Sequence, residues 1–193
     1  MLKGTKTAEN LMKSFAGECQ ARTRYTYYAS VAKKEGYVQI ANIFMETAEQ
    51  EKEHAKRFFK FLKSEYNGEA IEMTAGYPVA LYDETLMNLK SAAAGEHEEW
   101  AQDYPEFARI AREEGFIDIA IAYERIAEVE KRHENRYLKL LKNIENNTVF
   151  KKEEAVLWKC NNCGYIYEGD EAPSACPACL HPQGYFEVFL ENY

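Results

Sequence analysis

The sequence predicts a mainly α-helical protein, in which four long helices and a long crossover connection form a bundle and a small β-rich metal domain follows. Three observations predict this class. Apolar residues recur with the helical period of about 3.6 residues through most of the chain, part of the first half is repeated in the second half, and four cysteines form two Cys-x-x-Cys pairs near the end. We expect the bundle to span residues 1–147 and the small domain residues 153–193.

Length, charge and cysteine usage narrow the possible functions. A chain of 193 residues has room for one ordinary domain and a small one. Its 24 basic and 32 acidic residues give a net charge of −8, which argues against nucleic acids and anionic membrane surfaces as partners. Met1–Ala8 lacks the apolar core of a signal peptide, and no apolar run approaches the ~20 residues of a membrane span. We therefore expect a cytoplasmic protein whose paired cysteines bind metal.

The predicted helices are separated by residues that end helices. Gly36 and Gly115 mark two tight turns, and Asn67-Gly68 stops the second helix. The segment Glu69–Val79 has no helical period, and we expect it to cross the outside of the bundle as a strap. The predicted helices are Lys6–Glu35, Tyr37–Tyr66, Ala80–Glu114 with an interruption at Pro105, and Phe116–Asn146. Two helical hairpins joined by one long connection are a ferritin-like arrangement of a four-helix bundle.

The two halves of the bundle repeat each other. Tyr28–Tyr37 aligns with Phe107–Phe116 at an offset of 79 residues, whereas Gly17-Glu18 aligns with Gly95-Glu96 at an offset of 78. The third helix therefore holds one extra residue between Glu96 and Tyr104. A π-bulge would absorb this residue, and such bulges are frequent at functional sites. The alternative is a shifted helix end near Pro105.

Carboxylates and imidazoles recur in register on the apolar faces of the predicted helices. Glu51-x-x-His54 and Glu130-x-x-His133 each place a carboxylate and an imidazole one turn apart. One such pair is common on a protein surface, but a buried carboxylate costs several kcal/mol unless something compensates its charge. Glu18 and Glu96 add one carboxylate from each of the other two helices.

This set matches the ligands of a di-iron carboxylate site: one glutamate from each of two helices and Glu-x-x-His from the other two. We expect Glu51 and Glu130 to bridge two metal ions, with Glu18, Glu96, His54 and His133 as terminal ligands. Glu99 follows Glu96 by one turn, where the first half has Ala21. This fifth carboxylate could bind or leave the metals as their oxidation state changes.

The tail carries a second metal motif, formed by Cys160, Cys163, Cys176 and Cys179. Two Cys-x-x-Cys pairs indicate a tetrathiolate site, which in so short a segment would also stabilise the fold. The spacing alone leaves zinc and iron equally open. The alternating run Tyr185–Leu190 predicts a strand that pairs with Leu157–Lys159.

Taken in order, these motifs resemble the rubrerythrin family over nearly the full length of the chain. The resemblance implies a ferritin-like domain with two iron ions and a rubredoxin-like domain with one iron on four cysteines, with zinc as the alternative in that site. It implies a non-haem di-iron peroxidase that reduces hydrogen peroxide to water in oxidative-stress defence. It also implies a homodimer or homotetramer that takes electrons from a donor protein such as a reductase or a rubredoxin.

The resemblance assigns roles to four residues near the metals. In the family, one iron moves between a glutamate and a histidine on redox change, and these positions match Glu99 and His54. Tyrosines near the site match Tyr25 and Tyr104, for which ordinary core packing is the alternative. Leu180 departs from the glycine usual in rubredoxins and should strain its turn. Cys19 lies off the ligand face and is expected to be a bystander, with an oxidisable thiol as the alternative.

Two other functions fit parts of the sequence. A ferritin-like bundle could store iron in a cage, but the chain lacks a short fifth helix after Asn146 and has the cysteine tail instead. A zinc-stabilised tail could also accompany an oxygen-dependent oxidase.

Overall fold

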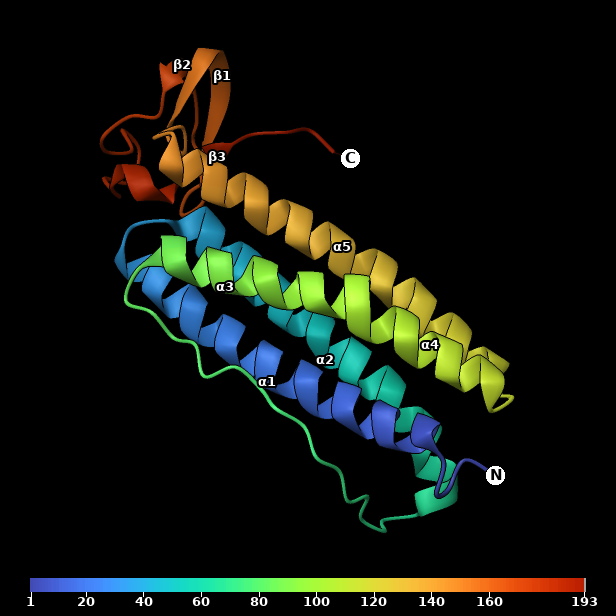
Figure 1. Cartoon of the computed structure of the whole chain (residues 1–193). Coiled ribbons are helices and arrows are strands. Elements are labelled where there is room, and N and C mark those ends of the chain that lie inside the picture. Colours follow the sequence, from blue (N-terminus) through green and yellow to red (C-terminus); the bar gives the residue numbers. More distant parts are fainter. Residues whose placement is uncertain (193) are drawn as a thin grey trace.

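The computed structural model describes residues 1–192 and contains the predicted bundle (Figure 1). Its third long helix consists of three consecutive parts, of which the middle one is a π-helix. The bundle elements are α1 (Lys6–Lys34), α2 (Val38–Tyr66), α3 (Thr85–Glu98), the π-helix η1 (Glu99–Asp103), α4 (Tyr104–Glu113) and α5 (Ile117–Glu145). Four long helical rods in two hairpins confirm the fold class.

The two hairpin turns have the same geometry. Gly36 and Gly115 adopt φ angles of +83° and +86°, which glycine reaches without a steric penalty. In the first turn the N–H of Tyr37 bonds to Ala32 O at 2.8 Å, and in the second the N–H of Phe116 bonds to Ala111 O at 2.7 Å. The sequence repeat is therefore a repeat of structure, with each half forming one helical hairpin.

The strap runs along the outside of α1, as predicted, but it extends further than the sequence indicates (Figure 1). The Tyr77 hydroxyl donates to Lys13 O at 2.9 Å and the Tyr28 hydroxyl to Ala80 O at 2.8 Å. The third helix was expected to begin at Ala80 but begins at Thr85. The cause is Asn88, whose amide bonds to both the N–H and the carbonyl of Tyr82 and holds that segment extended.

The extra residue of the third helix is absorbed as a π-turn. Glu99–Asp103 has π-helical hydrogen bonding, and α4 continues directly from Tyr104 with Pro105 in its first turn. This confirms the bulge and excludes a helix end at Pro105. Because Pro105 lacks an N–H, it fits near the point where the regular ladder restarts.

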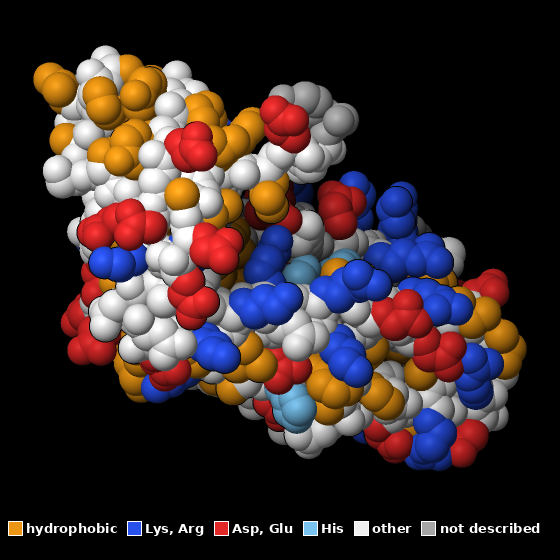
Figure 2. Space-filling view, turned by 90° about the horizontal axis from the view of Figure 1, so that it is seen from above, with side chains coloured by type: hydrophobic (Ala, Val, Ile, Leu, Met, Phe, Trp, Pro, Cys, Tyr) orange, Lys and Arg blue, Asp and Glu red, His pale blue; other side chains and the backbone are white. Residues whose placement is uncertain are grey.

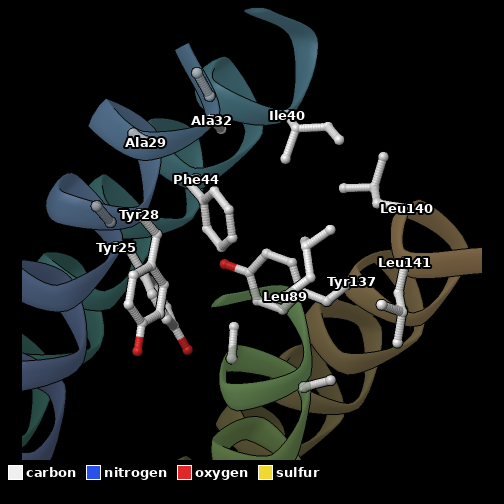
Figure 3. Packing of buried hydrophobic residues seen from close by; sticks show 14 of the residues in the cluster. Tyr25, Tyr28, Ala29, Ala32, Ile40, Phe44, Leu89, Tyr137, Leu140 and Leu141 are labelled. Atoms are coloured by element: carbon white, nitrogen blue, oxygen red, sulfur yellow. The ribbon is translucent and has the colours of Figure 1, made fainter. Parts of the chain in front are cut away.

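The apolar core of the bundle forms two clusters, one on each side of a polar middle layer. One cluster includes Tyr25, Phe44, Leu89 and Tyr137, whose side chains point toward one another from four helices (Figure 3). The other, at the opposite end, includes Leu11, Phe58, Leu62, Tyr104 and Tyr123. The predicted ligands lie between these clusters along every helix, where water is excluded from both directions.

The small domain is a three-stranded antiparallel sheet of order β2-β1-β3, built from β1 (Lys151–Cys160), β2 (Ile166–Glu171) and β3 (Phe186–Val188). Trp158 pairs with Val188 and Cys160 with Phe186, which confirms the predicted pairing of the last strand with the first. β1 begins at Lys151, five residues after Asn146, the residue that follows the end of α5. Tyr193, the last residue of the predicted domain, lies outside the described residues.

The small domain packs on the end of the bundle where α1 turns into α2 (Figure 1). The rings of Tyr37 and Phe150 stack there with centroids 6.1 Å apart and an interplanar angle of 6°. Figure 2 shows hydrophobic side chains gathered on the surface of this domain, whereas charged side chains of both signs cover the bundle face in view. The exposed hydrophobic residues of the domain include Leu157, Tyr165, Ile166, Tyr167 and Leu180. No helix within residues 1–192 is long and apolar enough to cross a membrane.

Candidate metal centres

Six predicted ligands converge in the middle of the bundle. They form two groups of four, in each of which all the ligand atoms lie within 4.8 Å of one another. Both groups contain Glu51 and Glu130, so the groups share two carboxylates. The first group is completed by Glu18 and His54, and the second by Glu96 and His133.

The two shared carboxylates each direct one oxygen to each group. Nδ1 of His54 lies 2.9 Å from Glu51 Oε2 and 2.8 Å from Glu130 Oε1. Nδ1 of His133 lies 3.1 Å from Glu51 Oε1 and 2.8 Å from Glu130 Oε2. A carboxylate that presents its two oxygens to two separate centres has the geometry of a bridging ligand. The division into bridging and terminal ligands stays a prediction, with which this arrangement is compatible.

Two buried tyrosines hold the terminal glutamates. The Tyr104 hydroxyl donates to Glu18 Oε1 at 2.5 Å, and the Tyr25 hydroxyl donates to Glu96 Oε1 at 2.5 Å. Tyr25 and Tyr104 are equivalent in the repeat, and each binds the glutamate of the other hairpin. These bonds fix one oxygen of each terminal carboxylate and leave the other free. Both tyrosines thus hydrogen-bond to predicted ligands and also pack in the core.

The free oxygens fit a metal pair. Glu18, Glu51, Glu96 and Glu130 are at most 1% exposed. Five of their carboxylate oxygens, and Nδ1 of His133, are buried and have no hydrogen bond of good geometry within residues 1–192. Unpaired buried polar atoms are costly, and four carboxylates supply the charge that two divalent cations need. Carboxylate and imidazole ligands suit iron and manganese, so this is a candidate di-iron carboxylate site.

In the absence of metal, protons compensate the buried charges. Burial disfavours the charged imidazole of His54, but hydrogen bonds to Glu130 and Glu51 outweigh this and raise its pKa to about 10. Burial also disfavours the charged form of His133, but hydrogen bonds to Glu130 and Glu51 outweigh it and raise the pKa to about 12. Burial and the nearby Glu51 charge raise the pKa of Glu96 to about 8. The pKa of Glu51 falls to about 2, because bonds to both histidines outweigh its burial.

Glu99 lies beside the centre rather than in it. Among residues 1–192, it belongs to neither four-residue group. It is half-buried and lines a cavity together with Tyr104. Burial, followed by the charges of Glu96 and Glu130, raises its pKa well above the usual range. Its role as a ligand remains a prediction.

Gln50 is a site residue that the sequence analysis missed. Its Oε1 lies 2.9 Å from Nε2 of His133, so it accepts that N–H and turns Nδ1 toward the carboxylates. Partners of this kind set the tautomer and orientation of a ligating histidine. The repeat conceals Gln50, because its equivalent before Glu130 is Val129.

Four cysteine sulfurs meet in the small domain, as the sequence predicts. Sγ of Cys160 lies 3.7 Å from Sγ of Cys179, and Sγ of Cys163 lies 3.6 Å from Sγ of Cys176. All four sulfurs fall within 4.8 Å of one another, which is a tetrathiolate, rubredoxin-like site. A backbone N–H of His181 stabilises the thiolate of Cys179 and lowers its pKa to about 6.

The two turns after the cysteine pairs are equivalent but differ in one residue. The N–H of Gly164 bonds to Cys160 O and that of Leu180 to Cys176 O, both at 2.8 Å. Gly164 has φ +78° and Leu180 has φ +61°, so the expected strain at Leu180 is present. Cys19 is exposed on α1, apart from both metal groups.

Comparison with known proteins agrees with both centres. The family model described as rubrerythrin matches residues 9–141, and the model for the rubredoxin-like domain of rubrerythrin matches residues 158–187. Rubrerythrin of Clostridium perfringens is 68% identical over 192 residues, which cover 100% of this chain and 98% of that protein. Rubrerythrin of Nitratidesulfovibrio vulgaris is 50% identical over 192 residues, with the same coverage.

Solved structures show the same fold. Fully reduced, all-ferrous nigerythrin has a TM-score of 0.65 at 32% identity and covers 98% of this chain and 92% of its own. Desulfovibrio desulfuricans bacterioferritin, with its diiron site in different catalytic states, has a TM-score of 0.66 at 26% identity and covers 74% of this chain and 82% of its own. With both family models matched and relatives aligned along the whole chain, this protein belongs to the rubrerythrin family.

Proposed function

We propose that the chain is a non-haem di-iron peroxidase that reduces hydrogen peroxide to water and receives its electrons through an iron on the four cysteines. One observation carries the proposal: two four-ligand groups share Glu51 and Glu130, and a tetrathiolate stands in the same chain. The first arrangement suits a two-electron reaction at two adjacent metals, and the second suits one-electron transfer.

The overall reaction is H₂O₂ + 2 H⁺ + 2 e⁻ → 2 H₂O, so the site must supply two electrons and two protons. When bound, a ferrous pair supplies the two electrons and polarises the O–O bond. The chain holds the ligands rigidly between two apolar clusters, which keep bulk water away. Glu99, His54, Tyr25 and Tyr104 form the proposed catalytic set, with His54 and Glu99 as alternative ligands.

The protons have a structural source beside the centre. Tyr104 and Glu99 both line the cavity that borders the ligands. Burial raises the pKa of Tyr104 well above its usual range, so this phenol keeps its proton at neutral pH. Burial also raises the pKa of Glu99. A protonated group next to the breaking O–O bond acts as a general acid. Tyr25 and Tyr104 also keep Glu18 and Glu96 in position through their hydrogen bonds.

The route of the electrons points to a second copy of the chain. The small domain packs at the Gly36 end of the bundle, whereas the predicted ligand Glu51 lies fifteen residues further along the chain in α2. This spacing is about 20 Å along the helix axis, so the Cys₄ site and the bundle site of one chain are far apart. We propose that electrons pass between subunits of a homodimer or homotetramer. A cytoplasmic donor such as a reductase or rubredoxin would dock on the exposed apolar residues around Cys163, among them Tyr165 and Leu180.

The experiment separates peroxide chemistry from electron relay. Cys160→Ser removes one of the four sulfurs, and Cys19→Ser, at the thiol outside both metal groups, is the matched control. Cys160→Ser should abolish turnover with an external electron donor but leave single-turnover oxidation of the pre-reduced bundle by hydrogen peroxide intact. Loss of both activities would remove the relay role. If the visible spectrum lacks thiolate-to-iron charge-transfer bands, the four cysteines hold zinc instead of iron.

A further inference from the structure

A cavity of about 360 Å³ lies next to the metal centre, between α1, the strap and the π-turn η1. Strap residues 74–78 form one wall, and Tyr104 connects the cavity to the ligand Glu18. Charged residues line it from both helices. They are Lys13 and Arg24 from α1, and Glu98, Glu99 and Asp103 from the third helix.

Arg24 brings an unsatisfied cation into this cavity. Its Nε and Nη1 atoms are buried and have no hydrogen-bond partner within the described chain. Lys13, the other cation of the cavity, is by contrast paired with Glu9 at 2.8 Å. Buried guanidinium N–H groups without an acceptor are costly, and a carboxylate is the acceptor that matches their geometry.

Glu99 is a suitable acceptor on the opposite wall. It stands outside both ligand groups and lines the same cavity as Arg24. Burial, followed by the charges of the nearby Glu96, Glu130 and Glu51, raises the pKa of this carboxyl group. Arg24 is the cation that acts on Glu99 in the opposite sense. The Glu99 carboxylate thus shares one cavity with the Arg24 guanidinium and feels the charges of the ligand cluster as well.

Neither Arg24 nor Glu99 has an equivalent of its own kind in the other half of the repeat. The first hairpin has Ala21 where the second has Glu99. Counted from the equivalent tyrosines, Tyr25 and Tyr104, the second hairpin has Asp103 where the first has Arg24. The pseudo-symmetric positions therefore lack both members of the pair. Two departures from the repeat that meet in one cavity point to a shared role.

We infer that Arg24 is the outer docking site of Glu99: its guanidinium receives the Glu99 carboxylate whenever that side chain is not bound to metal. Arg24 is thus a positioning residue. The inference rests on the proposed function, in which Glu99 and His54 alternate as ligands. A carboxylate binds a ferric ion more tightly than a ferrous ion because the charge is larger. By holding the released carboxylate, Arg24 favours the ferrous state and raises the midpoint potential of the bundle irons.

The test is a redox titration of the iron-loaded protein, with the Cys₄ iron of the same molecule as internal reference. Arg24→Gln should lower the midpoint potential of the bundle irons by about 59 mV for one electron, which is a tenfold change in the equilibrium constant for reduction. Arg24→Lys should restore at least half of this shift. Lys13→Gln removes the same charge from the same cavity and should have less than a third of the effect.

A double-mutant cycle with Glu99→Gln distinguishes docking from a general effect of charge. The inference requires the Arg24→Gln shift to vanish in the Glu99→Gln background. An equal shift in both backgrounds, or no shift in either, would overturn it. The Cys₄ potential and the unfolding midpoint report whether a variant remains folded. Peroxide turnover does not enter the measurement, so a protein that fails to reduce peroxide would overturn the proposed function and leave this result standing.

Discussion

Gly184 of the small domain lies directly against the backbone of Gly36, the residue that turns the chain from α1 into α2. A Cβ atom on Gly184 would stand 2.1 Å from the carbonyl oxygen of Gly36 and 2.9 Å from its carbonyl carbon. Non-bonded atoms do not approach so closely, so no side chain fits at this position. The stacked rings of Tyr37 and Phe150 adjoin this contact. A backbone-to-backbone contact thus fixes the small domain on the bundle.

Gly184→Ala should separate the two domains without unfolding either. Overpacking by one methyl group costs about 1–3 kcal/mol, which corresponds to a rise of about 5- to 150-fold in the undocked fraction. Limited proteolysis in the link between α5 and β1 should accelerate accordingly. Gly76→Ala is the matched control, because a Cβ there meets nothing within 4 Å. Equal cleavage rates for the two variants would show that the contact does not hold the domain.

Leu180→Gly should stabilise the small domain. Leu180 has φ +61° and is 80% exposed. Its left-handed backbone therefore costs free energy that burial of the side chain does not offset. Removing the Cβ should add about 1 kcal/mol to the free energy of unfolding. The reciprocal variant Gly164→Leu, at the equivalent turn with φ +78°, should destabilise the domain by a similar amount. Denaturant unfolding followed through the thiolate absorption measures both, and destabilisation by Leu180→Gly would refute the account of this turn.

Tyr104→Phe and Tyr25→Phe should weaken metal binding in the bundle. Each change removes the donor that orients a terminal glutamate, Glu18 or Glu96. Loss of such a partner costs about 10- to 100-fold in affinity. Competition of Fe²⁺ or Co²⁺ between the metal-free protein and a chelator gives the constants.

The control for the tyrosine variants is Tyr28→Phe. This residue is equally buried but donates to Ala80 O of the strap instead of to a ligand. The metal affinity of the Tyr28→Phe variant should remain within twofold of that of the parent protein. If all three variants bind metal alike, the two hydrogen bonds do not set the ligands.

The metal-free protein should lose stability as the pH rises from 6 to 9. Glu96 and His54 have folded-state pKa values of about 8 and about 10, against reference values of 4.5 and 6.5. Both values are raised, so the folded chain retains protons that the unfolded chain has released. The contribution of His54 is complete below pH 6.5 and is lost as the pH rises through 10; that of Glu96 is lost between 4.5 and 8.

Bound metal should abolish this dependence. The ligands then hold cations in place of protons, and the profile from pH 6 to 9 should become nearly flat. Thermal or urea unfolding at both ends of the range should show a loss of at least ~2 kcal/mol for the metal-free protein. A flat profile without metal would mean that the histidines are not held by Glu51 and Glu130 as observed.

The sequence predicted most of the metal centre because the same ligand motif occurs in both halves of the bundle. The constant offset between Glu51-x-x-His54 and Glu130-x-x-His133 identified the ligands, and the change of offset before Tyr104 located the π-turn. Periodicity also placed the helix ends near Gly36 and Gly115, where glycine permits the left-handed turn.

Contacts that break the repeat were beyond prediction. Asn88 shortens the third helix through bonds to Tyr82, which lies outside any helical pattern. Gln50 orients His133, but Val129 takes its place in the other half. The docking of Gly184 on Gly36 joins residues far apart in the chain, and two glycines carry no pattern that would link them. Such contacts depend on the packed structure rather than on local sequence.

In the proposed function, the bundle irons reduce hydrogen peroxide and the Cys₄ iron supplies electrons to them. The decisive experiment is anaerobic stopped-flow mixing of the fully reduced protein with one equivalent of hydrogen peroxide. The bundle irons should oxidise first, one peroxide should disappear for every two electrons, and the Cys₄ iron should oxidise only afterwards. Persistence of the peroxide, or oxidation of the Cys₄ iron ahead of the bundle irons, would contradict the proposed function.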